Sequence, residues 1–100
     1  MKNLLLLVFF LSLSSVVVVR AATYNILDYG AREDNLSTAA IQKAVDICHE
    51  EGGGTVMVPP GRFIIGTVIL KSNVNINLEP GALLEGSKNL DDYTTTFQKH

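Results

Sequence analysis

Residues 58–66 read VPPGRFIIG and residues 78–86 read LEPGALLEG, so one pattern returns after twenty positions. Each copy contains the apolar end of a strand, a Pro-Gly pair that turns the chain, a run of large apolar residues and a closing glycine. This spacing is about one coil of a β-solenoid, in which stacked repeats bury one another's apolar faces. The pattern therefore predicts a mainly β fold of stacked coils.

The segment between the two copies supports the same prediction. Residues 73–79 alternate polar and apolar side chains, which predicts a half-buried strand with Val74, Ile76 and Leu78 facing the core. The alternative is a pair of ordinary hairpins in a small sandwich. The sequence lacks the Asn-Gly and Asp-Gly turns that antiparallel neighbours favour, so we prefer stacked coils.

One amphipathic helix precedes the repeats, between short strands expected over residues 24–27 and 55–58. Ser37 or Thr38 can cap this helix, and Gly52 ends it. Its apolar residues follow the spacing of one helix face, and they are Ile41, Ala44, Val45 and Cys48. Such a helix could cover the open end of a solenoid, whose edge would otherwise pair with other chains.

The N-terminus has the composition of a secretory signal peptide. Lys2 supplies a positive start, residues 4–19 are rich in Leu, Val, Phe and Ser, and small residues follow. We expect residues 1–21 to be this peptide, with cleavage after Ala21 or Ala22. An uncleaved membrane anchor is the alternative, but this apolar run is shorter than the roughly 20 residues that a spanning helix needs.

The remaining residues, 22–100, hold six basic and ten acidic side chains. An acidic balance without a Lys or Arg cluster argues against nucleic-acid binding and against anionic membrane surfaces. Cys48 is the only cysteine, so no internal disulfide can brace a domain this small. We therefore expect residues 22–100 to be the incomplete front part of a longer domain, with residues 94–100 as an interruption and not a closing cap.

Residues 35–37 form an Asn-Leu-Ser glycosylation sequon. It would be an optional surface feature in a chain that enters a secretory route, and it would have no meaning in a bacterium. Asn73, Asn75 and Asn77 allow two interpretations that the sequence leaves open. They could stack in ladders with later coils, or they could face water.

The carboxylates give no catalytic pair. Glycoside hydrolysis needs two carboxyl groups about 5–10 Å apart. Asp91 and Asp92 are adjacent, so on an extended strand they would point to opposite faces, and we expect a solvated turn. Asp46 and Glu50 are four apart on the exposed helix face, where they would repel mildly. No partner can be named for the other acidic residues, which include Glu33, Asp34, Glu79 and Glu85.

Other site types also lack support. His49 and His100 have no Cys or carboxylate at metal-ligand spacing, so we expect no metal site. Residues 52–54 are three glycines between a helix and a strand, the reverse of a phosphate-binding loop. Cys48 on the apolar helix face is expected to be a small buried hydrophobe. No serine lies in a Gly-x-Ser-x-Gly motif. The residues therefore predict scaffold, with no catalytic, cofactor or metal residue in this chain.

An ordered series of motifs resembles glycoside hydrolase family 28, the polygalacturonase family of the pectate-lyase-like right-handed β-helix superfamily. The resemblance covers essentially all of residues 24–93. It is carried by residues 24–31 (YNILDYGA), 38–46 (TAAIQKAVD), 52–56 (GGGTV) and 58–61 (VPPG), and continues at 66–67, 70–74, 78–82 and 86–87. Lyase-like, rhamnogalacturonase and epimerase-like proteins of the superfamily open similarly.

The resemblance implies a single-stranded right-handed parallel β-helix capped by a helix at residues 38–51. It also implies a secreted, extracellular or periplasmic enzyme that hydrolyses α-1,4-galacturonosidic bonds in pectin with inversion and without a cofactor. The family's aspartates, histidine and Arg-x-Lys pair lie in later coils, and Asp91-Asp92 is not its Asp-Asp motif. The substrate would bind to those coils, and we expect the full-length protein to be a monomer. A related lyase, rhamnogalacturonase or epimerase, or a non-catalytic truncated β-helix, is the alternative.

This chain departs from the family pattern before the helix. Where relatives usually have Gly-Asp-Gly and a Thr-Asp pair, residues 32–37 read REDNLS and are shorter by about two residues. The loss of two glycines restricts the conformations that this turn can adopt.

Overall fold

The computed structural model describes residues 22–94, in which the strands pair in parallel. One sheet has the strand order β1-β2-β4 and a second pairs β3 with β5. The strands are β1 (Thr23–Asn25), β2 (Gly54–Val58), β3 (Gly61–Ile65), β4 (Val74–Leu78) and β5 (Ala82–Gly86). The predicted parallel β-helix is confirmed and the hairpin alternative is wrong.

Two spacings separate successive coils. In the first sheet Val58 pairs with Leu78, twenty positions on, as the sequence repeat predicts. In the second sheet Gly61 pairs with Ala82, one residue further than predicted. The third coil has an extra residue at its corner, where Gly81 has φ +89° and its carbonyl accepts a hydrogen bond from the Gly61 N–H at 3.1 Å.

This one-residue shift decides which side chains face the core, since successive strand residues point to opposite faces. Phe63 pairs with Leu84, where the equal spacing of the sequence would have given Leu83. Leu84 packs against the core, whereas Leu83 is 50% exposed. The extra corner residue thus places the apolar side chain of Leu84 next to Phe63 on the core side of the sheet.

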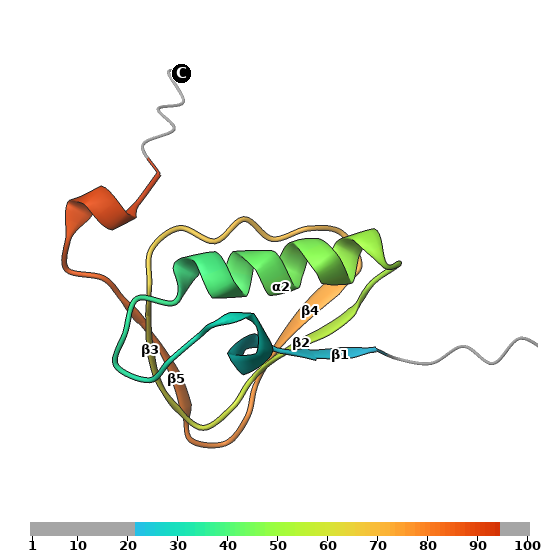
Figure 1. Cartoon of the computed structure of the whole chain (residues 1–100), viewed down its shortest axis with the longest axis horizontal. Helices are drawn as coiled ribbons and strands as arrows, with labels where there is room; N and C mark the ends of the chain where they lie inside the picture. Colours follow the sequence, from blue (N-terminus) through green and yellow to red (C-terminus); the bar gives the residue numbers. More distant parts are fainter. Residues whose placement is uncertain (1–21, 95–100) are drawn as a thin grey trace, which may run out of the picture.

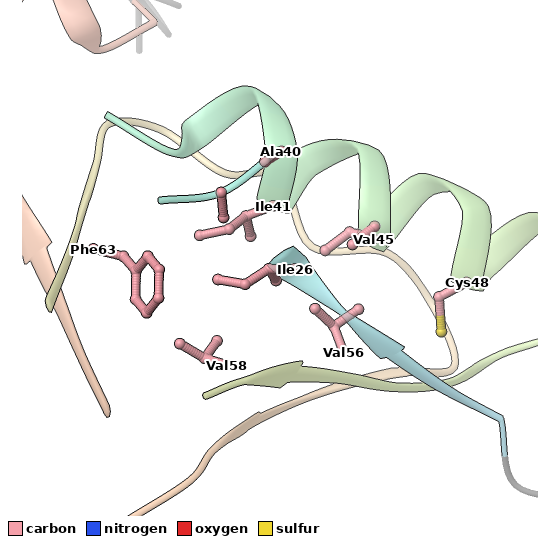
Figure 2. Close-up of a cluster of buried hydrophobic side chains, with 10 residues drawn as sticks. Ile26, Ala40, Ile41, Val45, Cys48, Val56, Val58 and Phe63 are labelled. Carbon is pink, nitrogen blue, oxygen red and sulfur yellow. The ribbon is translucent and has the colours of Figure 1, made fainter. Parts of the chain in front are cut away.

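The core lies between the apolar face of α2 (Thr38–Glu50) and the inner faces of the strands (Figure 2). Figure 2 shows Ile26 between the helix side chains and Val56 of β2. The buried apolar side chains are Ile26, Ala31, Ala40, Ile41, Ala44, Val45, Cys48, Val56, Val58 and Phe63. The predicted apolar helix face, Cys48 included, is therefore buried.

Helix α2 ends one residue before the predicted 38–51 boundary, in a hydrogen-bonded cap. Gly52 has φ +101° and donates its N–H to the His49 carbonyl at 3.1 Å. Gly53 donates to the Cys48 carbonyl at 2.8 Å, which completes a Schellman motif. The glycines predicted to end the helix do so by satisfying its last carbonyls.

The start of α2 differs from the prediction. Ser37 is the N-cap residue, but its side chain makes no hydrogen bond to the helix. The Thr38 hydroxyl instead accepts from the Gly66 N–H at 2.8 Å. The two candidate caps therefore tie the helix start to neighbouring loops.

The first strand is shorter than predicted. β1 ends at Asn25, because the Asn25 side chain accepts from the Leu27 N–H at 2.9 Å and starts the 3₁₀ helix η1 (Ile26–Tyr29). Gly30, at φ +104°, ends η1. The predicted strand over 24–27 is wrong at its C-terminal half, although Ile26 is buried as the strand pattern required.

The segment after β3 runs alongside α2 on its way to β4 (Figure 1). The Gln42 side chain binds both backbone groups of one residue in this segment: it donates to the Ile69 carbonyl at 3.0 Å and accepts from the Ile69 N–H at 2.7 Å. His49 Nδ1 lies 2.9 Å from the Ser72 carbonyl. The polar face of α2 therefore anchors residues 67–73, which we call the strap.

Several predictions concern residues beyond the described range. The signal peptide over residues 1–21 and the interruption after Thr94, with His100, lie there. Between residues 22 and 94, no helix combines the length and the apolar composition that a membrane span requires.

Candidate functional site

A hollow of about 470 Å³ lies on the inner side of the third coil. Its walls come from α2, β3, the strap, β4, β5 and the segment that follows β5. It is lined by Ile41, Ile65, Gly66, Thr67, Val68, Leu70, Ile76, Leu84 and Tyr93. None of these side chains is charged, and the two hydroxyls among them, those of Thr67 and Tyr93, are both hydrogen-bonded to the backbone, so the hollow offers mainly apolar contact.

The segment after β5 folds back along the ends of β3 and β5 as the 3₁₀ helix η2 (Leu90–Asp92). The Tyr93 hydroxyl donates to the Ser87 carbonyl at 2.7 Å, and the Thr94 N–H donates to the Thr67 hydroxyl at 3.0 Å. A Cβ on Gly66 would lie 1.8 Å from the Asp92 carbonyl oxygen. Gly66 is thus required for this close approach.

Asp91 and Asp92 do not lie on an extended strand, because they belong to η2. Asp91 is exposed, as the predicted solvated turn requires. Asp92 is half-buried and its carboxylate accepts a hydrogen bond from the Ser87 hydroxyl. The pair does not form a cleft with a second carboxylate within the described residues, so Asp92 has a structural role in the turn.

Asp46 is not the solvated side chain that helix periodicity predicts. Its carboxylate lies 2.8 Å from Lys71 Nζ of the strap and accepts from Gln42 Nε2 at 2.9 Å. These two hydrogen bonds, led by that from Lys71, lower the pKa of Asp46. Glu50 is exposed, as predicted.

Arg62 joins three consecutive coils on the outer face of the second sheet. One guanidinium nitrogen lies 2.8 Å from Asp34 Oδ1 and the other lies 2.8 Å from Glu85 Oε2. The hydrogen bond from Arg62 lowers the pKa of Glu85. The sequence offered no partner for Asp34 or Glu85, because both pairings depend on which residues stack across coils.

The other predicted residues are also placed in the scaffold. Glu33 packs against Gly61, where a Cβ would lie 2.6 Å from the Glu33 carboxylate oxygen. Glu79 donates its N–H to the Val58 carbonyl at 2.9 Å.

Burial raises the pKa of the Cys48 thiol, which is consistent with an inert buried side chain. The Tyr24 hydroxyl donates to the Glu51 carboxylate, and this bond raises the pKa of Tyr24 to about 12.

The three candidate asparagines do not share one role. Asn75 and Asn77 are exposed on β4, in register with Thr55 and Met57. Asn73 has φ +66° and its carbonyl accepts from the Gly54 N–H at 2.9 Å, so it forms the corner before β4. Stacking of these side chains with later coils stays a prediction, because the described residues include no coil beyond β5.

Three titratable groups that could bind a metal do not come together anywhere between residues 22 and 94. The described part of the chain has no cluster of carboxylates, histidines or cysteines facing a common space. Its polar side chains instead connect elements that are distant in sequence. The described coils therefore have a structural role, and their side chains do not assemble a catalytic or metal-binding group within residues 22–94.

Comparison with known proteins finds similar chains and structures, although no protein-family model matches the chain. An exo-poly-α-D-galacturonosidase from Dickeya chrysanthemi is 45% identical over 76 residues, covering 74% of this chain and 12% of the relative. The structure of the family 28 exopolygalacturonase from Yersinia enterocolitica matches with a TM-score of 0.73 and 38% identity, over 82% of this chain and 14% of that one.

A third match has a different activity in its name. The A-module of mannuronan C-5 epimerase AlgE6 from Azotobacter vinelandii matches with a TM-score of 0.59 and 30% identity, over 64% of this chain and 20% of the module. These neighbours are right-handed β-helix proteins, which confirms the predicted fold class and the resemblance to family 28. The chain spans only about an eighth of the galacturonosidase it resembles.

Proposed function

We propose that this chain, a relative of the family 28 polygalacturonases, forms the cap and first coils of a glycosidase that hydrolyses α-1,4-galacturonan in pectin with inversion. The observation that carries the proposal is the 45% identity to an exo-poly-α-D-galacturonosidase over 76 residues. The Yersinia exopolygalacturonase match, over 82% of this chain, supports the same assignment.

Within this proposal the described residues form the end of the β-helix that α2 covers, and they supply no catalytic residue. Inverting hydrolysis requires one carboxylic acid to protonate the leaving oxygen and another carboxylate to activate water. The described carboxylates with known partners are held in place by Arg62, Lys71, Ser87 or Tyr24. The proposed acid and base therefore belong to coils outside this sequence, and no metal or cofactor is needed for them.

We further propose that the protein is exported and that cleavage follows Ala21. The Ala22 carbonyl accepts a hydrogen bond from the Thr55 N–H at 2.9 Å, next to β1. Cleavage after Ala21 keeps this bond, whereas cleavage after Ala22 removes it. The mass of the secreted chain distinguishes the two sites.

A second candidate function is supported by the AlgE6 match: an epimerase or lyase acting on uronate polymers. Both of those reactions begin by removing the proton at C5 of the sugar, and hydrolysis leaves it in place. The products therefore separate the candidates. A lyase leaves an unsaturated uronide, an epimerase changes the sugar without cleaving the chain, and a hydrolase releases saturated reducing ends.

The test uses the longest reading frame that contains this sequence, expressed and incubated with polygalacturonate. We expect saturated reducing ends whose first-formed anomer is β, as seen by proton NMR, because inversion of an α-linkage gives a β product. Ultraviolet-absorbing unsaturated products, or no cleavage by a folded protein, would overturn the assignment. Residues 22–100 alone should release no reducing ends.

A further inference from the structure

The sequon at residues 35–37 lies in a turn that presents its asparagine to solvent. The Asn35 N–H donates to the Arg32 carbonyl at 3.2 Å, and Asp34 between them has φ +61°. A carboxylate side chain tolerates this left-handed conformation better than most, which allows the turn to form without the family's glycines. Asn35 is exposed as a result.

In the folded turn the Asn35 amide nitrogen makes one hydrogen bond, on a side chain that is exposed. Asn35 Nδ2 donates one proton to the Glu33 carbonyl at 2.9 Å. A primary amide carries two such protons. Replacing the second proton with a sugar keeps the bond to Glu33, so glycosylated Asn35 can adopt the same conformation.

The third sequon residue, in contrast, is inaccessible. Ser37 is 2% exposed, and its hydroxyl accepts from the Arg32 N–H at 3.2 Å and lies 3.1 Å from the Asn35 carbonyl. A transferase that recognises the hydroxyl of an Asn-x-Ser acceptor cannot reach it once this loop has formed. Modification at this sequon must therefore precede folding of residues 32–37.

We propose that Asn35 is an N-glycosylation site that is modified during translocation, before its loop folds. The donor would be a lipid-linked oligosaccharide pyrophosphate. A bond forms between Asn35 Nδ2 and the anomeric carbon of the first sugar, and the bond from that carbon to the pyrophosphate oxygen breaks. The lipid pyrophosphate leaves with the electron pair, and Nδ2 loses one proton to a base of the transferase. The proposal rests on the export that the proposed function includes.

The position of Asn35 gives the glycan a physical role. The Asn35 carbonyl accepts from the Ile64 N–H at 3.2 Å, and Leu36 pairs in parallel with Ile64, so this segment is the first-coil neighbour of β3. Within residues 22–94, Leu36 has its strand partner on that side alone. A glycan here would cover a strand edge that could otherwise pair with another chain.

The test is cell-free translation of residues 1–100 with microsomes of the eukaryotic endoplasmic reticulum, followed by protease protection. We expect protected molecules to carry one oligosaccharide, seen as a slower-migrating species that an amidase specific for N-glycans converts to the unmodified mobility. The amidase leaves aspartate at position 35, which mass spectrometry identifies. Residues 35–37 form the only Asn-x-Ser/Thr sequence in the chain, so one site accounts for any signal.

Three variants serve as matched controls. Asn35→Gln and Ser37→Ala should each abolish the slower species, whereas Ser37→Thr retains the hydroxyl and should keep it, because recognition precedes folding. Protected but unmodified wild-type chain would overturn the glycosylation site and leave the proposed glycosidase intact. If no molecule becomes protected, both this site and the proposed export are wrong. Folded protein incubated with detergent-solubilised microsomes, in which the transferase is accessible, should remain unmodified, and its modification would contradict the required order.

Discussion

The second and third coils have the same inward-facing positions but differ in burial. Val58 and Phe63 of the second coil are 0% exposed. Their register partners in the third coil are Leu78, which is 44% exposed, and Leu84, which is partly buried. The residue types are equally apolar, so composition does not explain the difference.

The difference in burial follows from how many neighbouring elements cover each coil. In the second coil β2 lies between β1 and β4, and α2 covers the inner face. The third coil has a described neighbour on one side, and the apolar hollow occupies its inner face. Apolar residues in a solenoid therefore stabilise the fold in proportion to the number of coils that cover them.

The largest expected effect follows from this comparison. Phe63→Ala should lower the free energy of unfolding by about 3–5 kcal/mol, because it removes a fully buried ring and leaves a cavity. Leu84→Ala, at the register partner, should cost only about 1–2 kcal/mol, because Leu84 is incompletely buried. Urea unfolding followed by circular dichroism measures both.

Leu83→Ala is the matched control for this pair. Leu83 is 50% exposed on the opposite face of the same strand, so the change should stay within about 0.5 kcal/mol. Equal losses for Phe63→Ala and Leu84→Ala would show that the number of covering coils does not set the contribution. A loss from Leu83→Ala as large as that from Leu84→Ala would contradict the observed register.

A second contrast lies between the two glycines after α2. Gly52 and Gly53 both have positive φ, but a Cβ on Gly53 would lie 2.5 Å from the Asn73 carbonyl oxygen, while one on Gly52 meets nothing within 4 Å. Gly52→Ala should therefore cost about 1 kcal/mol from backbone strain alone. Gly53→Ala should cost more, roughly 2–3 kcal/mol, because it also forces β4 away from the helix end. Thermal unfolding would rank the two, and a larger loss for Gly52→Ala would contradict the close approach at Asn73.

The spacing of apolar residues predicted the helix and the strands well, because that spacing reflects which side chains of each element must face the core. The helix face with Ile41 and Cys48 and the alternating strand at residues 74–78 both follow from side chains that must meet the core. The second-sheet register could not be predicted, since Glu79-Pro80-Gly81 fits the same Pro-Gly pattern as Pro59-Pro60-Gly61 while placing one more residue at the corner.

The polar contacts were less predictable still. Asp46 was predicted to be solvated because its partner Lys71 lies in the strap, which has no regular sequence pattern. Arg62 binds Asp34, 28 positions before it in sequence, and Glu85, 23 positions after it. Such pairings appear only after the coils are stacked. The sequence also predicted that this chain has no catalytic pair. The accompanying prediction, that later coils carry the catalytic residues, stays a prediction because the described residues include none of those coils.

A smaller effect should distinguish the strap from the sheets. Gln42→Ala removes both hydrogen bonds to the backbone N–H and carbonyl of Ile69. Each exposed hydrogen bond contributes about 0.5–1 kcal/mol, so losing both should accelerate hydrogen exchange at the Ile69 amide about fivefold to thirtyfold while exchange in β2 stays unchanged. Lys43→Ala, one residue along on the exposed face, is the control. Equal acceleration in β2 would mean that the strap and the sheet open together.

The smallest effect expected is the pH dependence of the two ion-paired carboxylates, Glu85 on the outer sheet and Asp46 beside the strap. Both have pKa values lowered by a neighbouring cation, from ordinary values of 4.5 and 3.8. A lowered folded-state pKa means that the unfolded chain binds the proton first, so the stabilisation is present above the ordinary pKa and is lost as pH falls through the folded-state value. The urea midpoint should therefore drop between about pH 5 and pH 3.

The two carboxylates can be separated by substitution. Glu85→Gln and Asp46→Asn should each lower the midpoint at pH 7 and flatten its acid dependence, because the variant has no charged carboxylate left to neutralise. Glu50→Gln is the matched control: it removes one helix carboxylate and none of the ion pairs found within residues 22–94. Because both carboxylates keep about a third of their side-chain surface exposed, the change should be modest and should shrink in high salt. An acid dependence that Glu85→Gln and Asp46→Asn both leave intact would mean that these ion pairs contribute nothing, and that coil stacking and the remaining hydrogen bonds hold the strap and the outer sheet in place.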